Sequence, residues 1–175
     1  MSSKPETMGR FEALVLTHNT ALYRYALWLC GNDALAKDLV QETFLRAWKA
    51  FDRLQDDDAA KSWLITILRR EYARTFERKV PPFTDLDGLE LEDPTELTPE
   101  ARAERDLLRR SIGALKPRYR EPLLLQVVMG LSCDEIAVQL GVGKNAVMTQ
   151  LHRARAQLKE KLQRDGITGN VHELF

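Results

Sequence analysis

The stretch from residue 131 to residue 159 constrains the fold of this chain more than any other. Ser132 and Glu135 have the spacing of a capping box, in which each side chain pairs a backbone N–H that a helix start leaves unpaired. A helix is therefore predicted to begin at Cys133, with an apolar face made of Ile136, Ala137 and Leu140. Gly141 tolerates a positive φ, so we expect it to end this helix in a sharp turn with Val142 filling the corner.

A second helix is predicted from Lys144 onward, and its two faces differ in character. At about 100° per residue, its apolar residues form one narrow inward stripe: Val147, Leu151, Ala154 and Leu158. The opposite face carries Asn145, Thr149, His152 and Arg153, flanked by Met148, Arg155 and Gln150. Two helices joined by a glycine turn, with such a polar and basic face on the second, are typical of the helix-turn-helix that reads the DNA major groove. The alternative is a helical hairpin with an ordinary solvated face.

Several protein classes are disfavoured by the rest of the chain. No apolar run approaches the roughly 20 residues of a membrane span, and the first residues lack the apolar segment of a signal peptide. We therefore expect a cytoplasmic protein without stable membrane insertion. Cys30 and Cys133 lie in apolar helical patterns without zinc spacing, which predicts buried free thiols and no metal. No catalytic constellation and no glycine-rich phosphate loop is found, so we expect neither an enzyme nor a cofactor.

The net charge of zero conceals three different segments. Residues 1–80 hold 13 Lys and Arg against 11 Asp and Glu, residues 81–106 hold 2 against 9, and residues 107–175 hold 11 against 6. The acidic middle segment also contains prolines and a glycine that interrupt helices. This pattern indicates two nucleic-acid-facing modules joined by an acidic linker with little fixed structure. A plain acidic loop is the alternative.

The N-terminal part predicts a helix from about Phe11 to Leu29 that ends at Gly31, followed by a helix capped by Asp33. The second helix has two faces with apolar residues. Its expected core face consists of Val40, Phe44, Ala47, Trp48 and Phe51. Its other face mixes Leu35, Leu39 and Leu45 with Asp38, Gln41, Glu42, Arg46 and Lys49. Such surplus apolar surface marks either a partner site or a contact with another helix of the same domain.

A third helix is predicted from Lys61 to Lys79. Leu64, Leu68 and Tyr72 are expected to face inward, and the opposite side carries Trp63, Ile67, Arg70, Arg74 and Arg78. Arginines pair with phosphates and an indole stacks on bases, so this stripe suits single-stranded nucleic acid. The alternative is a solvated basic face with a partly buried tryptophan.

Three segments resemble the two modules of bacterial RNA polymerase sigma factors. They are DLVQETFLRAW from residue 38, KSWLITILRR from residue 61, and LKPRYREPLLLQVVMGLSCDEIAVQLGVGKNAVMTQLHRARAQL from residue 115. More narrowly, the chain resembles the extracytoplasmic-function (ECF) subfamily, which keeps only these two modules. The resemblance extends from about Phe11 to Leu162, and the order, spacing and total length of the segments agree together.

The resemblance implies a role for each surface. The family's segment that docks on polymerase core matches Asp38, Gln41, Glu42, Leu45 and Arg46. The segment that melts the downstream promoter element, captures a flipped base and holds the exposed strand matches the loop at 52–60 and the helix after it, with Lys61, Trp63, Arg70, Arg74 and Arg78. The segment that reads the upstream element as duplex matches Lys144, Asn145, Thr149, Gln150, His152, Arg153 and Arg155.

The implied partners are RNA polymerase core, contacted at its clamp helices and flap, promoter DNA, and an anti-sigma factor that covers the same surfaces. Some positions depart from the family pattern. Met148 and Gln150 stand where cations are common, and Glu71-Tyr72 replaces a position often held by Asn. Two alternative functions stay open: a helix-turn-helix regulator that acts without polymerase core, and a sigma mimic that sequesters an anti-sigma protein.

The predicted fold is all-α, with two small helical domains. Residues 1–79 are expected to form a helical bundle like sigma region 2, which binds core and melts the promoter. Residues 80–99 are the acidic linker, residues 100–165 a helix-turn-helix domain like sigma region 4, and residues 166–175 a tail without an assigned role.

Overall fold

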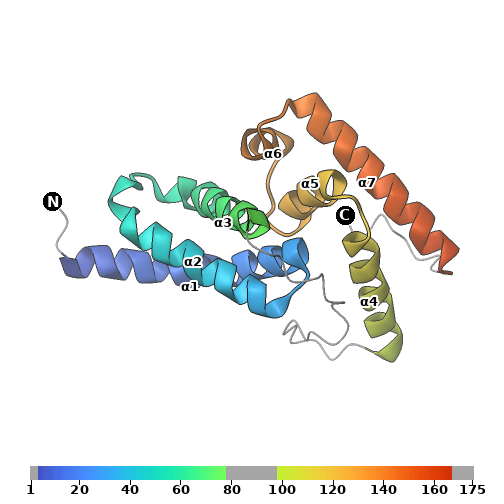
Figure 1. Cartoon of the computed structure of the whole chain (residues 1–175), viewed down its shortest axis with the longest axis horizontal. Helices are drawn as coiled ribbons and strands as arrows, with labels where there is room; N and C mark the ends of the chain where they lie inside the picture. The colour runs from blue at the N-terminus through green and yellow to red at the C-terminus, as the bar shows by residue number, and fades with distance from the viewer. Residues whose placement is uncertain (1–3, 78–97, 167–175) are drawn as a thin grey trace. The chain divides into compact units, whose positions relative to one another are not determined.

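The computed structural model describes residues 4–77 and 98–166, and every regular element within these ranges is a helix (Figure 1). The chain divides into two compact units, residues 1–83 and residues 84–175. The predicted all-α fold is confirmed. The predicted linker and tail lie outside the described residues, except for residues 98, 99 and 166.

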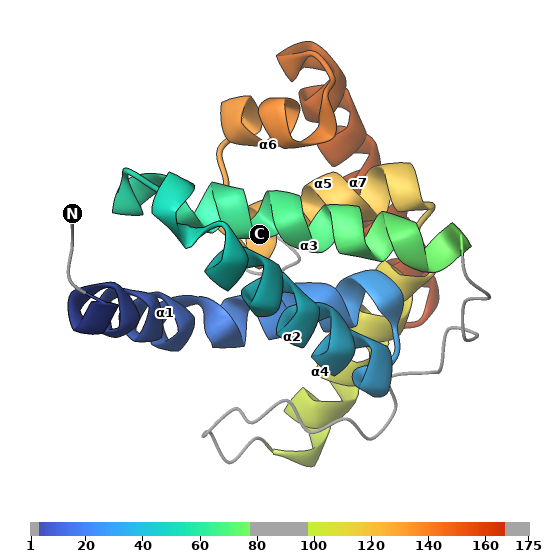
Figure 2. The ribbon, with the colours of Figure 1, turned by 60° about the vertical axis from the view of Figure 1, so that its left-hand side comes forward.

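Within residues 4–77, the first unit is a bundle of three helices. They are α1 (Lys4–Cys30), α2 (Asp33–Lys49) and α3 (Ala60–Glu77), with two short 3-10 turns, η1 (Phe51–Arg53) and η2 (Asp57–Ala59), between α2 and α3. The helix α2 packs against both α1 and α3 (Figure 2). The core contains Leu22, Tyr25, Leu27, Ala36, Leu64, Ile65 and Leu68. Since burial of one leucine contributes about 1.5–3 kcal/mol, these side chains account for the association of the helices.

The junction of α1 and α2 corrects one prediction. Gly31 has a φ of 63°, as the sharp turn after α1 requires. The N-cap of α2 is Asn32, whose side chain accepts a hydrogen bond from the backbone N–H of Leu35 at 2.9 Å. Asp33 is instead the first helical residue and accepts hydrogen bonds from Tyr23 and Lys37. Asn32 takes the cap because its backbone has the extended conformation that capping needs.

The two faces of α2 are not divided as the helical wheel predicts. Leu39, assigned to the outer face, is only 3% exposed, whereas Trp48, assigned to the core, is 38% exposed. Leu39 is therefore a core residue, because α2 has a neighbouring helix on two sides. Trp48 packs at the edge of the bundle, where its ring lies 4.9 Å from the ring of Phe11 and 6.4 Å from that of Phe51.

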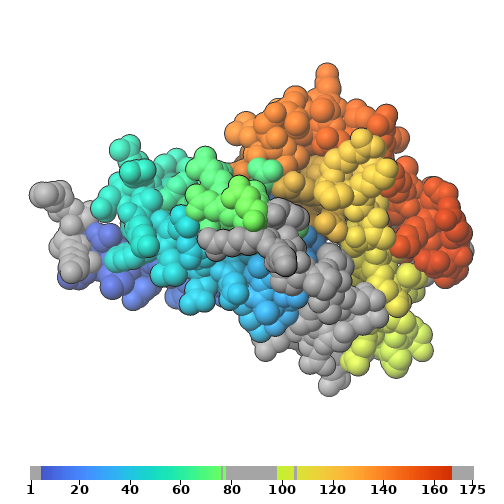
Figure 3. Space-filling model, in the orientation of Figure 1, coloured from blue at the N-terminus to red at the C-terminus, as the bar shows by residue number. Residues whose placement is uncertain are grey.

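Within residues 98–166, the second unit contains four helices: α4 (Pro99–Gly113), α5 (Pro117–Val127), α6 (Cys133–Leu140) and α7 (Lys144–Arg164). The long helix α7 packs against the other three. Its predicted inward stripe is confirmed, because Val147, Leu151, Ala154 and Leu158 are all buried, and Leu162 extends it by one turn. Figure 3 shows α6 and α7 at the surface of their unit, and α2 and α3 at the surface of the first.

The predicted helix-turn-helix is confirmed in its local details. The Ser132 N–H donates to the Glu135 carboxylate at 2.7 Å, and the Glu135 N–H donates to the Ser132 hydroxyl at 3.2 Å. Gly141 ends α6 with a φ of 65°. Val142, however, is 38% exposed and does not fill the corner, because Ile136 and Val147 already bury the inner side of the motif.

Other expectations concern cysteines, membranes and metals. Cys30 is buried as predicted, but Cys133 is only half-buried because it lies in the first turn of α6. In the part of the chain that the structure describes, no helix is long and apolar enough to cross a lipid bilayer. The same residues contain no cluster of three His, Cys, Asp or Glu side chains suited to a metal ion.

Candidate polymerase and nucleic-acid interfaces

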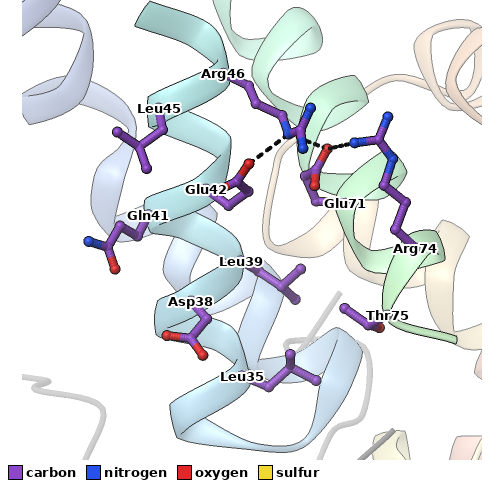
Figure 4. Close-up of a pocket in the computed structure, with 10 residues that line it drawn as sticks. All are labelled: Leu35, Asp38, Leu39, Gln41, Glu42, Leu45, Arg46, Glu71, Arg74 and Thr75. Carbon is purple, nitrogen blue, oxygen red and sulfur yellow. Dashed lines mark hydrogen bonds and ion pairs between the residues drawn. The ribbon is translucent and has the colours of Figure 1, made fainter. Parts of the chain in front are cut away.

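A groove of about 630 Å³ lies between α2 and α3, and we call it the α2 groove (Figure 4). Its α2 side consists of Leu35, Asp38, Leu39, Gln41, Glu42, Leu45 and Arg46, and its α3 side of Glu71, Arg74 and Thr75. All five residues predicted to bind polymerase core therefore line one groove. Asp38, Glu42 and Leu45 follow helical spacing along one side of α2, which explains why they lie together.

The α2 groove combines an apolar side with charged groups. Leu39 is buried at its base, while Leu45 is 49% exposed. Asp38 is exposed and Glu42 is half-buried. An apolar strip beside carboxylates suits an amphipathic helix that carries basic side chains.

An ion-pair network joins α2 to α3 at one end of this groove (Figure 4). Arg46 Nε lies 2.8 Å from Glu42 Oε1 and 2.6 Å from Glu71 Oε1. Arg74 donates a hydrogen bond to the same Glu71 oxygen at 3.1 Å. Glu71 is only 8% exposed, so its carboxylate depends on these arginines in place of water. The sequence singled out Glu71 only as a departure from the family pattern, and its closeness to Arg46 follows from the packing of the two helices.

A second groove, of about 320 Å³, continues on the other side of this network. It is lined by Arg46, Lys49, Ala50, Arg53, Trp63, Ile67, Arg70, Glu71 and Arg74, and we call it the basic groove. It holds five cations and one carboxylate, which is already paired with arginines. Arg46 and Lys49 lie in the last turn of α2, where the helix dipole favours positive charge.

The basic groove contains only part of the predicted single-strand stripe. Trp63, Arg70 and Arg74 line it together, and Arg53 is a cation that the sequence reasoning missed. Lys61 is half-buried at the start of α3 and is not among the lining residues. Arg78 lies outside the described residues. A helical wheel of α3 alone does not include Lys49 or Arg53, because both residues precede α3 in the chain.

The aspartate loop, residues 52–58, connects α2 to α3 and carries four aspartates against one arginine. Arg10 of α1 reaches it: its Nε donates to Asp57 Oδ1 at 2.9 Å, and a terminal nitrogen donates to the Leu54 carbonyl at 3.0 Å. The hydrogen bond from Arg10 holds the pKa of the Asp57 carboxyl below its ordinary value. Leu54 is buried, whereas the other residues of the loop are exposed.

Five of the seven predicted duplex-binding residues are exposed on α7, and four of them lie together on its solvent-facing side. Asn145, Thr149, His152 and Arg153 are all exposed. Thr149 donates its hydroxyl hydrogen to the Asn145 carbonyl at 2.9 Å. Hydroxyl, amide, imidazole and guanidinium groups on one exposed helix face can bond both phosphates and base edges.

The other three predicted residues have partners or positions of their own. Lys144 donates to Asp134 of α6 at 2.8 Å, and this hydrogen bond raises the pKa of the lysine. Arg155 donates to the Gln126 side chain of α5 and is half-buried. Gln150 has a buried Oε1 without a hydrogen-bond partner among the described residues. The structure therefore separates Gln150 and Arg155 from the exposed set.

Arg153 is held at the edge of the exposed face by α5. Its hydrogen bond to the Tyr119 hydroxyl lowers the pKa of that phenol. Tyr119 is buried, and the Arg118 guanidinium lies 4.7 Å from its ring centre. Two arginines from different helices thus meet at one tyrosine, an arrangement that spacing within α7 alone does not predict.

The two units define a protein of the sigma-70 class. Sigma-70 region 2 matches residues 14–80, and Sigma-70 region 4 matches residues 105–158. The ECF RNA polymerase sigma factor SigL of Mycobacterium tuberculosis is 35% identical over 166 residues, which cover 89% of this chain and 90% of SigL. The chain belongs to the ECF RNA polymerase sigma factors, as its sequence motifs predict.

Two solved structures share the fold. The sigma factor RpoE of Bartonella quintana, in complex with the anti-sigma factor NepR, has a TM-score of 0.71 and 27% identity, covering 89% of this chain and 98% of RpoE. CnrH, in complex with the cytosolic domain of CnrY, has a TM-score of 0.66 and 28% identity, covering 89% of each chain. The family consists of transcription initiation factors that direct RNA polymerase to promoters.

Proposed function

We propose that this chain binds RNA polymerase core through the α2 groove, holds melted promoter DNA in the basic groove and reads duplex DNA with the exposed face of α7. The observation that carries the proposal is the junction at Arg46 and Glu71, where the two grooves adjoin across one ion-pair network. A factor that holds polymerase and DNA at once needs two adjoining surfaces of different character. These assignments also define the roles of the two units.

The α2 groove is proposed to receive the clamp helices of the polymerase. Asp38 and Glu42 present carboxylates one helical turn apart, and Leu45 offers exposed apolar surface beside them. A helix with basic and apolar side chains complements this surface in charge and shape. A contact of the second unit with the polymerase flap is proposed from the family resemblance alone.

The basic groove is proposed to hold the melted strand. Its cations neutralise phosphates, and Trp63 at its wall provides a surface on which a base stacks. Lys61 and Arg78, at the two ends of the stripe predicted from the sequence, are assigned to the same strand from the family resemblance alone. Single-stranded DNA suits such a site because its flexible backbone and exposed bases reach both kinds of group.

The exposed face of α7 is proposed to bind the upstream promoter element as duplex. Asn145, Thr149, His152 and Arg153 supply groups for base edges and phosphates. Lys144 adds a cation near the start of the helix, although its ion pair with Asp134 competes with DNA for it. Gln150 and Arg155 are assigned to the margin of the interface because both are partly covered by their own unit.

Control by an anti-sigma factor is proposed as well. The solved relative RpoE is bound to the anti-sigma factor NepR, and the α2 groove and α7 of this chain are surfaces that such a partner would cover. The proposed place of action is the cytoplasm, where polymerase and DNA are found. We propose no covalent chemistry for this chain.

The proposal is tested by run-off transcription with purified polymerase core and the full chain on a genomic fragment library, with sequencing of the transcript ends. Discrete start sites that share two spaced upstream motifs are expected. The variant Asp38→Lys is expected to lose core binding and transcription, whereas Glu12→Lys, an exposed site on α1, serves as the matched control.

Other outcomes separate the alternatives. If the chain neither binds core nor supports transcription but binds duplex DNA alone, it is a conventional helix-turn-helix regulator. If it captures an anti-sigma protein yet supports no transcription from any fragment, it is a sigma mimic. The half-buried Gln150 and the apolar Met148 on α7 are the features that favour this second reading.

A further inference from the structure

The N-terminal helix makes an unusual contact with the aspartate loop. Two nitrogens of Arg10 converge on Asp57 Oδ1, at 2.9 Å and 2.5 Å, and one of them also donates to the Leu54 carbonyl at 3.0 Å. The guanidinium carbon lies 5.1 Å from the centre of the Phe51 ring. One side chain of α1 therefore contacts Phe51, just before the loop, and both Leu54 and Asp57 within it, all more than 40 positions away in the sequence.

The rest of the loop is held by few interactions. Phe51 and Leu54 anchor it to the core, and the backbone N–H of Asp58 donates to the Asp56 side chain at 2.9 Å. Among the described residues, Asp57 is the one aspartate of the loop that forms an ion pair. The tip between Leu54 and Asp57 thus owes its position to a buried leucine on one side and to Arg10 on the other.

The charge of the loop makes this contact informative. DNA repels carboxylates, yet the segment assigned to strand capture carries four aspartates and one arginine. Arg10 neutralises one aspartate and holds that carboxylate toward α1. The hydrogen bond also keeps the carboxylate ionised, since it lowers the pKa of Asp57.

We propose that Arg10 is a positioning residue for promoter melting: it holds the aspartate loop in the conformation that receives the unpaired base. This inference rests on the proposed function, and within it on the capture of a flipped base that the family resemblance implies for the loop. Arg10 itself is not proposed to touch DNA. It acts by fixing Leu54 and Asp57, so that the exposed loop residues between them meet the strand in one conformation.

The geometry distinguishes arginine from lysine at this position. A guanidinium has several donors in a rigid fork, so it bonds Asp57 and the Leu54 carbonyl simultaneously. A lysine ammonium is a single point at the end of a flexible chain and is expected to retain the ion pair while losing the backbone contact. Arg10→Lys should therefore lie between wild type and Arg10→Ala.

The test uses the full chain with polymerase core and a promoter identified by run-off transcription. Open-complex formation is followed by the fluorescence of a base analogue in the downstream element. The rate of open-complex formation is measured on two promoters, one with the preferred base and one with a substituted base at the captured position. For Arg10→Ala, we expect the ratio of the rate with the preferred base to the rate with the substituted base to fall about twofold to fivefold, with unchanged affinity for polymerase core.

Three variants make the result specific. Asp57→Asn is expected to reproduce the loss, and the exchanged pair Arg10→Asp with Asp57→Arg is expected to restore much of the ratio. Glu12→Ala, at an exposed site on the same helix, is the matched control. Thermal unfolding of each variant shows whether it is folded, and the exchanged pair tests the inference even if Arg10→Ala is unstable.

The outcomes separate this inference from the proposed function beneath it. If Gln55→Ala and Asp58→Ala in the aspartate loop reduce base discrimination while Arg10→Ala and Asp57→Asn leave it unchanged, the positioning role is refuted and strand capture by the loop stands. If none of the four variants changes discrimination, the loop does not capture the base. A lower unfolding temperature with unchanged discrimination would show that Arg10 only stabilises the bundle.

Discussion

Replacing Glu71 by glutamine is expected to destabilise the first unit by about 1–2 kcal/mol. Loss of one partner from a buried ion pair costs about 3–5 kcal/mol. That figure is an upper limit here, because the side chains of Arg46 and Arg74 remain 42% and 52% exposed. Glutamine keeps the shape of Glu71 but leaves the two arginines facing each other with Glu42 as the remaining carboxylate of the network.

Tryptophan fluorescence measures this loss in the full chain. All three tryptophans, Trp28, Trp48 and Trp63, lie in the first unit, so their emission reports its unfolding and not that of the second. For a unit of this size, about 1–2 kcal/mol corresponds to a midpoint lower by roughly 4–16 °C. Glu77→Gln, an exposed acid on the same helix, is the matched control.

The same substitution has a second expected effect, on DNA binding. Without Glu71 the basic groove keeps its five cations and loses its one carboxylate, so single-stranded DNA should bind more tightly. The slope of log affinity against log salt concentration should become steeper by about 0.7 for each additional phosphate neutralised. Affinity for polymerase core should fall, because Arg46 loses its fixed position in the α2 groove. A variant with the stability and the salt dependence of the Glu77→Gln control would refute the assigned role of the network.

Three further predictions concern other parts of the two units. Burial, and secondarily the charge of Lys61, lowers the pKa of His18 in the folded protein. Since an unfolded histidine has a pKa of about 6.5, the unfolded chain binds more protons than the folded one below that pH, and the free energy of unfolding should fall as pH decreases from about 7 through the folded pKa. His18→Gln should reduce this dependence on pH in urea titrations. Trp63→Ala should weaken open-complex formation by about 1–3 kcal/mol with unchanged duplex binding; equal losses in both assays would exclude base stacking. Arg153→Ala should reduce affinity for the upstream duplex in gel-shift assays, whereas Arg155→Ala should mainly lower the unfolding temperature of the second unit because its guanidinium bonds Gln126.

Much of the second unit is predictable because its determinants are local. A capping box needs only Ser132 and Glu135 at the right spacing, and a positive φ needs only a glycine at position 141. The buried stripe of α7 is also a local property, since 3.6 residues per turn bring Val147 and Leu151 to one side. The same reasoning explains why the residues of the α2 groove contributed by α2 itself were predicted together.

Sequence alone therefore determined the class of fold, the two ends of α6 and the family, because each depends on residues that lie close together in the sequence. The tertiary structure decided which faces are covered: Leu39 is buried and Trp48 partly exposed because α2 has helices on two sides. It also decided the long-range pairs, with Glu71 beside Arg46 and Arg10 beside Asp57. Periodicity specifies the direction in which a side chain points from its own helix, but the partner it meets is set by how the helices pack together.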